Sequence, residues 1–218
     1  NINGDSVQVL QILFLTTMIT LLPSLAVMMT SFAKYVISLS FLRTAMGTQQ
    51  NPPNMVLVGL AIFLTLLTMQ PVFQQINTQA LEPYQEEEIS EEEFLDRAVV
   101  PLKRFMLDNT DEGALGLYCD LAGMETPLGE ASVDLPLHIV VPSFMTSELK
   151  EAFLIGFLLY IPFVLIDIVV ASTLMSMGMI MLPPAMISTP FKLLLFISVN
   201  GWEMLFAALV RGVGLGLP

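Results

Sequence analysis

Charged residues are scarce in this chain, and most of those it has lie in one segment. Only 13% of its 218 residues are charged, whereas a soluble globular domain has about a quarter. Of the 20 acidic residues, 17 lie between Glu82 and Glu151, so the formal net charge of −12 describes one insert and not the whole protein. An acidic insert in a nearly uncharged chain argues against nucleic-acid binding.

Residues that commonly carry chemistry are also few. The single cysteine, Cys119, cannot form an internal disulfide, and the single histidine, His138, argues against a catalytic triad or a histidine metal site. No glycine-rich phosphate loop follows a strand-like run. The two acids inside apolar runs, Asp167 and Glu203, share no intramembrane-protease motif. We therefore expect no enzymatic activity, no cofactor and no metal site.

Long apolar runs are what the chain has instead. A helix needs about 20 predominantly apolar residues to cross a bilayer. Four segments are long enough to be candidates: Val7–Met29, residues 54–75, Ala152–Leu182 and Phe191–Val210. We predict an all-α integral membrane protein with four long hydrophobic helices in two hairpins and a small helical extracytoplasmic insert.

The predicted spans divide the chain into three regions. We expect a first hydrophobic hairpin over residues 1–81 (spans at about 7–29 and 54–75), the acidic insert over 82–141, and a second hairpin with a methionine-rich loop over 142–218. Within the insert, EEEISEEEFLDRAVVPLKRFMLDN and GALGLYCDLAG predict helices, and TPLGEASVDLPLH predicts a loop. We interpret the glutamate runs as a solvated helix face, with a divalent-cation site as the alternative.

Two basic residues set the predicted orientation. Lys34 and Arg43 lie between the first two spans, in the only short loop with a net positive charge, which the positive-inside rule places in the cytoplasm. Both termini and the insert then lie outside. The chain starts at Asn1 and not at a methionine, which indicates either a truncated chain or a removed signal peptide; the second agrees with this topology.

The longest run, Pro142–Pro184, reads PSFMTSELKEAFLIGFLLYIPFVLIDIVVASTLMSMGMIMLPP. Thr146 predicts a helix start, with Glu148 and Glu151 in the first turns, where the helix dipole favours anions. Four prolines are expected to kink helices or close turns: Pro23, Pro162, Pro183 and Pro184.

Asp167 and Lys192 form the best candidate pair of charges. If one helix ends near Met177 and the next starts near Pro184, the two residues lie at similar distances from the turn and therefore at similar depth. A buried acid and base at one level are expected to pair, within a chain or between neighbours. A proton relay, or a Lys192 side chain that extends to the membrane interface, are the alternatives.

Four methionines stand at alternate positions before the double proline: Met175, Met177, Met179 and Met181. Thioethers bind Cu(I), which is one interpretation. Methionine is also flexible and polarisable, so a ring of these side chains from several subunits could close a pore and still deform around a passing chain. Ordinary core packing is the third interpretation.

The run Pro142–Pro184, together with QNPPNMV at Gln50–Val56 and PLKRFML at Pro101–Leu107, resembles the FliP family of flagellar export-gate proteins and its relatives in injectisomes. The resemblance covers nearly the whole chain. It implies a pore-forming core subunit of the flagellar type III protein export gate, which passes unfolded flagellar substrates across the inner membrane and is required for flagellum assembly.

The resemblance also implies partners and a place. These are a homo-oligomer (a pentamer in the family) with FliQ and FliR, with FlhB and FlhA nearby, in membrane lipid at the flagellar basal body, and with the insert on the periplasmic side. It favours Met177, Met179 and Met181 as a gasket in the pore. The alternative is a subunit of a small-solute or metal-ion transporter, which would need internal repeats. The Pro142–Pro184 pattern has no second copy in the chain.

Overall fold

The computed structural model describes residues 12–13, 16–17, 20–21, 23–127, 129–179 and 181–214. Each regular element in these residues is a helix, as predicted. In chain order the elements are α2 (Phe32–Ala45), α3 (Asn54–Ile76), η1 (Asn77–Leu81), α4 (Glu82–Gln85), α5 (Glu91–Asp108), α6 (Glu112–Leu121), η2 (Gly129–Asp134), α7 (Leu137–Ser176), α8 (Ala185–Ser198) and α9 (Gly201–Arg211). η1 is a π-helical turn that continues α3 into α4, and η2 is a short 3-10 helix.

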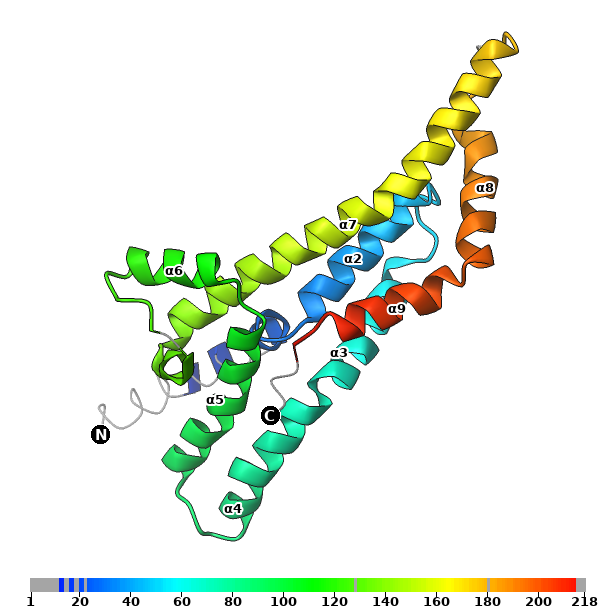
Figure 1. Cartoon of the computed structure of the whole chain (residues 1–218). Coiled ribbons are helices and arrows are strands. Elements are labelled where there is room, and N and C mark those ends of the chain that lie inside the picture. Colours follow the sequence, from blue (N-terminus) through cyan, green and yellow to red (C-terminus); the bar gives the residue numbers. More distant parts are fainter. Residues whose placement is uncertain are drawn as a thin grey trace.

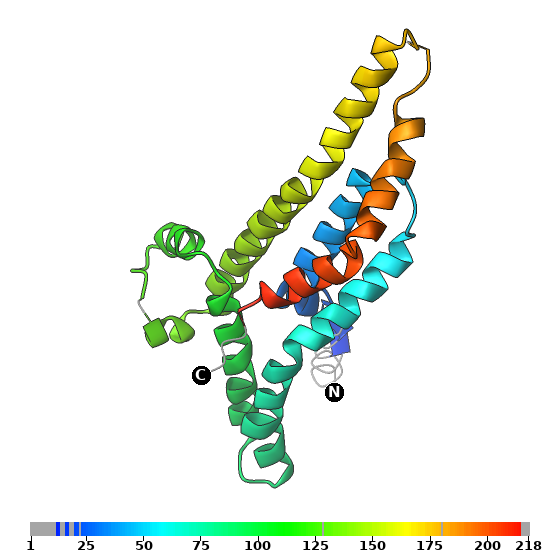
Figure 2. The same cartoon turned by 45° about the vertical axis from the view of Figure 1, so that its right-hand side comes forward.

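Helix α7 is the axis of the molecule (Figure 1). Helix α2 lies along it and runs in the same direction, while α3 runs back toward the insert. The insert helices α5 and α6 gather at the first end of α7, and α8 returns beside its far end. Figure 2 shows the same arrangement turned by 45°. The lower half contains several helices packed together, and the α7–α8 hairpin forms an upper arm.

The core lies in the lower half, between α2, α3, α5 and α7. Helical spacing places one apolar stripe of each helix on a common centre. Fully or almost fully buried side chains include Tyr35, Leu39 and Leu42 of α2, Leu57 and Met69 of α3, Phe105 and Met106 of α5, and Ile139, Val140 and Phe144 of α7. The rings of Phe105 and Phe144 pack edge to face across α5 and α7.

Gly156 allows α2 and α7 to approach closely. A Cβ built on Gly156 would lie 2.5 Å from ring carbons of Phe41 on α2, closer than atoms can pack. The ring of Phe41 also packs edge to face on Phe153 of α7. A small residue at position 156 therefore fixes the distance between these two helices.

Helix α7 has 40 residues and begins at Leu137, directly after Pro136. The predicted start at Thr146 is therefore wrong. Pro142 and Pro162 both lie inside the helix, where each proline lacks one backbone hydrogen bond. Ile139 and Val140, just before Pro142, are buried in the core. At ~1.5 Å per residue α7 is ~60 Å long, about twice the hydrocarbon thickness of a bilayer.

The segment predicted as a short basic loop is mostly helix α2. Its buried face has Lys34, Tyr35, Leu39 and Leu42 at helical spacing. Lys34 lies at the same end of α7 as the insert, because it contacts Glu148. Lys34 therefore cannot mark the loop opposite the insert, and the orientation argument keeps only Arg43.

The last predicted span, Phe191–Val210, is not one helix. It is divided into α8 and α9, which are bent by 64° to each other. Asn200 at the break has the left-handed φ of +52°, and a Cβ on Gly201 would lie 2.3 Å from the ring of Phe196. The Asn-Gly dipeptide is a turn signal, and here it overrides the apolar run.

Two helices in the described residues are long and apolar enough to cross a membrane: residues 54–85, which join α3, η1 and α4, and α7. The bent α8–α9 pair is a third candidate if it counts as one span. Much of the predicted first span, Val7–Met29, lies outside the described residues, so that span stays a prediction; its proline, Pro23, lies in residues 23–28, which are described and helical.

The insert contains the two predicted helices, α5 and α6. Ser90 is the N-cap of α5, and its hydroxyl accepts a hydrogen bond from the backbone N–H of Glu93. Three glutamates occupy the first turn of the helix. Pro101 is buried within α5, which remains one helix from Glu91 to Asp108. The segment predicted as a loop contains the short η2 helix.

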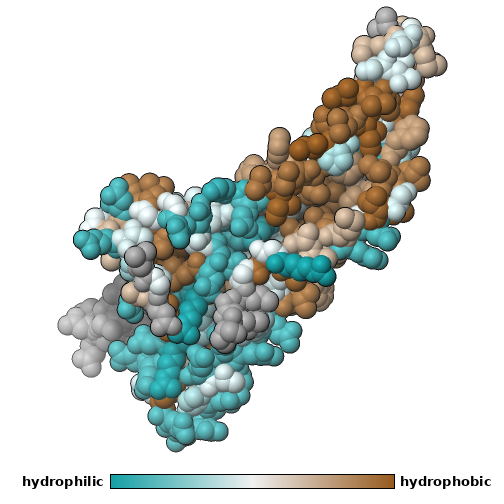
Figure 3. All heavy atoms as spheres, viewed as in Figure 1, coloured by the Kyte–Doolittle hydropathy of each residue, from teal (hydrophilic) through white to brown (hydrophobic). Residues whose placement is uncertain are grey.

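The surface divides in the same way as the fold. Figure 3 shows hydrophilic residues over the insert end and hydrophobic residues over the α7–α8 arm. Large exposed apolar side chains on the arm include Phe157, Leu158, Leu165, Ile168, Val169, Phe191, Leu194 and Ile197. An apolar surface of this extent indicates a lipid or protein interface.

Candidate functional site

The methionine stretch forms the tip of the arm. Helix α7 ends at Ser176, and α8 begins at Ala185 directly after Pro184, so the predicted helix end near Met177 and helix start near Pro184 are confirmed. Gly178 follows with the left-handed φ of +78°, which reverses the chain. The double proline Pro183–Pro184 completes the turn before α8.

The four methionine side chains point away from the chain's own core. Met181 is 99% exposed, and Met175, Met177 and Met179 are exposed as well. Core packing within one chain is therefore the wrong interpretation for these residues. The two remaining interpretations each require a binding partner at the tip. That partner is either a metal ion or the same loop of other subunits.

Lys192 and Asp167 lie together where α7 and α8 face each other below the tip. Lys192 Nζ is 2.6 Å from Asp167 Oδ2; the lysine side chain is 7% exposed, and that of the aspartate is 43% exposed. The Lys192 side chain is buried between Asp167 of α7 and the end of α2, which argues against its extension to a membrane interface. The ion pair is also less buried than expected, because the Asp167 side chain is partly exposed to solvent.

Lys192 makes a second contact that the sequence does not reveal. Its Nζ donates a hydrogen bond to the backbone carbonyl of Ala45, at the carboxyl end of α2, over 3.1 Å. A cation there also complements the negative end of the helix dipole. Gly47 follows with φ of +73°, and a Cβ on it would lie 3.1 Å from Thr189 Oγ1 of α8. Lys192 thus joins α2, α7 and α8.

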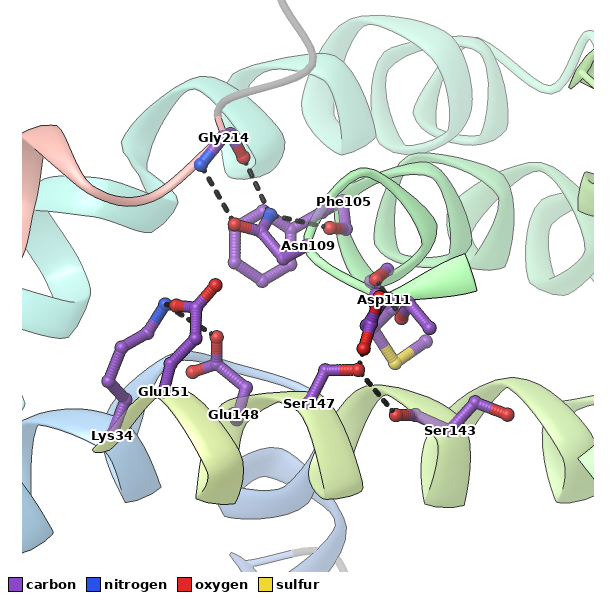
Figure 4. Close-up of polar contacts among 11 residues, drawn as sticks. Lys34, Phe105, Asn109, Asp111, Ser143, Ser147, Glu148, Glu151 and Gly214 are labelled. Carbon is purple, nitrogen blue, oxygen red and sulfur yellow. Dashed lines mark hydrogen bonds and ion pairs between the residues drawn. The ribbon is translucent and has the colours of Figure 1, made fainter. Parts of the chain in front are cut away.

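A second charge cluster lies at the other end of α2. Lys34 Nζ lies 2.7 Å from Glu148 Oε1 and donates a hydrogen bond to Glu151 Oε2, also over 2.7 Å. Lys34 and Glu148 are almost completely buried, whereas Glu151 is 49% exposed. Figure 4 shows both carboxylates pointing toward the lysine. One lysine therefore faces two carboxylates.

Sequence reasoning missed this cluster. Glu148 and Glu151 were interpreted as helix-start anions, but they lie 11 and 14 residues into α7, which begins at Leu137. Their role is to meet Lys34, more than 100 residues earlier in the chain. The signal that could have found it is the stripe Ser31, Lys34, Tyr35 and Ser38, which places polar groups at helical spacing in an apolar run. Burial raises the pKa of Tyr35 to about 12, so its phenol stays neutral.

The turn between α5 and α6 attaches the insert to α7. The backbone N–H of Asp111 donates to Ser147 Oγ over 2.8 Å, and Lys150 Nζ lies 2.6 Å from Asp111 Oδ2. The hydrogen bond from Lys150 holds the pKa of the Asp111 carboxyl below its usual value. Tyr118 of α6 adds a hydroxyl contact to Thr146 at 3.0 Å.

The same turn holds the end of the described chain. Asn109 Nδ2 donates to the carbonyl of Gly214 over 2.7 Å, and the N–H of Gly214 donates to Asn109 Oδ1 over 2.8 Å (Figure 4). Asn109 Nδ2 also donates to the carbonyl of Phe105. One amide side chain thus connects α5 with the segment that follows α9.

The acidic residues of the insert do not converge. In the part of the chain that the structure describes, no group of three or more His, Cys, Asp and Glu side chains could hold a metal ion. The divalent-cation interpretation of the glutamate runs therefore finds no support, and these glutamates lie exposed on α5 and before it.

Comparison with known proteins identifies the family. The FliP family model matches residues 15–209. The flagellar biosynthetic protein FliP of Bacillus subtilis is 48% identical over 201 residues, which cover 92% of this chain and 90% of that protein. That of Aquifex aeolicus is 47% identical over 208 residues (95% and 87%), and that of Caulobacter vibrioides is 46% identical over 215 (97% and 80%). The matches give no support to the transporter alternative, and the chain belongs to the FliP family.

Proposed function

We propose that this chain is a pore-forming core subunit of the flagellar type III protein export gate and passes unfolded flagellar substrates across the inner membrane. The observation that carries the proposal is the match to flagellar biosynthetic proteins named FliP over more than nine-tenths of the chain. The described charge clusters contain no candidate active site, since their charged side chains bind one another in ion pairs or bind the backbone at a helix end.

The exposed arm supports an oligomer. Its apolar side chains need a cover, and neighbouring copies or lipid supply one. The family resemblance implies a pentamer with FliQ and FliR, close to FlhB and FlhA, in the flagellar basal body. In that assembly Lys192 holds α2, α7 and α8 together through its contacts with Ala45 and Asp167. The exposed side of Asp167 lies at the interface between copies.

Met177, Met179 and Met181 then act as a soft apolar gasket. They stand exposed on a glycine- and proline-bounded tip, where copies of the loop can converge. An apolar constriction blocks ions by dewetting, and unbranched thioethers can deform when a chain passes. The gasket needs no metal, which separates it from a Cu(I) site.

The test compares two triple variants at these positions. Alanine at all three removes the seal volume but no charge, so the complex should assemble and leak ions. Leucine has similar volume and should keep the seal. Ion conductance in cells, with assembly checked on native gels, measures both. An alanine variant that assembles and stays as tight as the wild type contradicts the gasket; failure of both variants alike, with Cu(I) bound only by the wild type, favours the copper site.

The proposed orientation places the insert in the periplasm. Its test uses cysteines at Thr126 in the insert and at Gln50, in the α2–α3 turn at the opposite end of α2; both positions are exposed. A membrane-impermeant thiol reagent, applied to cells with a permeabilised outer membrane, should label only the Thr126→Cys chain. The parent chain is the control, because its Cys119 is buried. Labelling of Gln50→Cys alone would reverse the orientation.

A further inference from the structure

The charge cluster between α2 and α7 contains one cation and two anions. Lys34 Nζ lies 2.7 Å from Glu148 Oε1 and 2.7 Å from Glu151 Oε2, so the three ionised groups together have one excess negative charge. The side chains of Lys34 and Glu148 are almost completely buried. An excess charge is costly in such surroundings, and burial favours the neutral form of an acid.

The carboxyl group of Glu148 lacks the hydrogen bonds that a buried carboxylate needs. Its Oε1 meets the lysine, yet within the described residues neither of its oxygens accepts a hydrogen bond of regular geometry. An ionised carboxylate has about four lone-pair sites to satisfy, whereas a protonated one has fewer and gains a donor. Because the side chain is 0% exposed, bulk water does not supply the missing bonds. The protonated form therefore suits this site better than the ionised form.

Hydroxyl groups of α2 provide acceptors for that donor. Ser31, Tyr35 and Ser38 are buried at helical spacing on the face of α2 that contains Lys34. In the part of the chain that the structure describes, their side-chain oxygens have no hydrogen-bond partner. Burial raises the pKa of Tyr35 to about 12, and the negative charge of Glu148 adds to that rise, so the neutral phenol lies within range of the carboxyl. A hydroxyl oxygen can accept the proton of a carboxylic acid.

The other elements around α7 do not balance the cluster. Helix α3 contains no charged residue, and α5 packs Phe105 on Phe144, one turn before Glu148. The remaining charged or titratable groups on elements packed against α7 are exposed or have partners of their own: Arg104, Asp108, Glu112 and Asp120 are exposed, Lys103 donates to the carbonyl of Val133, Asp111 pairs with Lys150, Tyr118 bonds Thr146, and Lys192 pairs with Asp167.

Glu151 connects the cluster to solvent. Its side chain is 49% exposed, although it shares the lysine with the buried Glu148. Both glutamates precede Ala152, where the predicted apolar span begins, so the cluster lies at the insert end of α7. Protons from bulk water can therefore equilibrate with the cluster along the exposed side of Glu151.

We propose that Lys34, Glu148 and Glu151 form a proton-binding site, in which Glu148 takes up a proton while Lys34 remains paired with Glu151. A hydronium ion transfers its proton to the Glu148 carboxylate and becomes water, and the excess negative charge of the cluster is neutralised. The packing of α2 on α7 then strengthens as the pH falls through the range in which Glu148 binds its proton. This site lies outside the proposed export function and does not depend on it.

Infrared spectroscopy of the purified full chain in detergent tests the proton directly, because a protonated carboxyl has a carbonyl stretch separate from that of a carboxylate. In a pH series, we expect one carboxyl to stay protonated well above about pH 4.3, where exposed glutamates titrate. Glu148→Gln should remove this band. Glu92→Gln, at an exposed position of α5, is the control and should keep it. A wild-type spectrum without the band, or a band that Glu148→Gln leaves unchanged, would overturn the proposal.

Glu151→Gln tests the charge count. The variant leaves one carboxylate for one lysine, so the excess negative charge is removed and Glu148 should lose its proton more readily. We expect its band to disappear at a pH lower by about one unit or more. A band that keeps its wild-type pH dependence would contradict a site in which the two glutamates share Lys34.

The pH dependence of unfolding gives a second readout. An acid that binds its proton more tightly in the folded chain stabilises the fold as the pH falls. Between about pH 8 and about pH 5, the wild-type denaturation midpoint should therefore rise relative to that of Glu148→Gln. The difference between the two profiles separates Glu148 from every other titrating group. A Glu148→Gln profile that runs parallel to and below the wild type would mean that Glu148 is only an ionised partner of Lys34.

Discussion

The insert end and the α7–α8 arm are built in opposite ways. At the insert end, α2, α3, α5, α6 and α7 share a core, and polar contacts from Lys34, Asn109 and Asp111 join segments far apart in the sequence. The arm has one hairpin, with apolar side chains exposed on both helices. One half is thus packed by its own chain, whereas the other leaves apolar side chains exposed to a lipid or protein interface.

Lys192 is the link between these halves. It lies in the arm, yet it donates to the carbonyl of Ala45 at the end of α2, a helix of the core. Through this contact the position of the arm depends on α2. The comparison therefore predicts that substitutions which remove contacts at the insert end unfold the chain. Substitutions that remove contacts in the arm should leave a folded chain that fails to assemble.

Loss of Lys34 should have the largest effect. Lys34→Ala leaves Glu148 buried without its cation, and removing one partner of a buried pair costs about 3–5 kcal/mol. We expect loss of the folded subunit, measured by chemical denaturation in detergent and by protease sensitivity. Glu151→Gln is the control, because half of that side chain is exposed and the Lys34–Glu148 pair remains. Similar stability of Lys34→Ala and the wild type would show that the cluster is not structural.

Lys192→Met should break the arm and spare the core. The variant keeps the length of the side chain but loses the ion pair with Asp167 and the hydrogen bond to Ala45. We expect the free energy of unfolding of the isolated subunit to stay within about 1 kcal/mol of the wild-type value, since the site is at the edge of the fold. Native gels should show lost assembly. Normal assembly and export by this variant would remove the proposed role of the pair.

The charge pair in the arm could be predicted from sequence, and the cluster at the insert end could not. Asp167 and Lys192 flank one turn marked by a double proline, so helix geometry alone brings them level. Lys34 and Glu148 meet only because α2 packs along α7; the polar stripe around Lys34 indicates a buried helix face, but nothing local identifies Glu148 as its partner. The positive-inside argument failed for Lys34 for the same reason, because a lysine with a buried partner does not report membrane orientation.

The helices themselves show the same division. The periodic segments α5 and α6 were predicted from their own residues, and so was the long apolar α7 apart from its start. Helix α2 was missed because its buried face includes a lysine and serines, which resemble a loop until their partners are known. The break at Asn200 had a local signal in Asn-Gly, which the length of the apolar run outweighed.

Two glycines test how the arm is attached to α2. Gly47 and Gly178 both have left-handed φ values, so alanine strains the backbone at each. Only Gly47 has close neighbours, with Thr189 Oγ1 3.1 Å from the position of a new Cβ; Gly178 has open space around it. Gly47→Ala should therefore lower assembly and thermal stability more than Gly178→Ala. Equal effects in a thermal melt would mean that backbone strain, and not contact with α8, accounts for both.

The smallest effect should come from the surface contact between the insert and α7. Folding lowers the pKa of Asp111 through its hydrogen bond from Lys150, so the ionised carboxylate is favoured in the folded state. A carboxyl of this kind stabilises the fold above its unfolded pKa near 3.9, and the contribution disappears as the pH falls through the lower, folded value. Asp111→Asn should lower the denaturation midpoint slightly at pH 7, where the contribution is fully present, and flatten the dependence of that midpoint on pH below about 4; both effects should be small because the group is exposed and solvent screens it. Lys150→Met should give the same flattening, since it removes the same contact from the other side. A pH profile unchanged in both variants would mean that the insert is held to α7 by the Ser147 hydrogen bond and apolar packing alone.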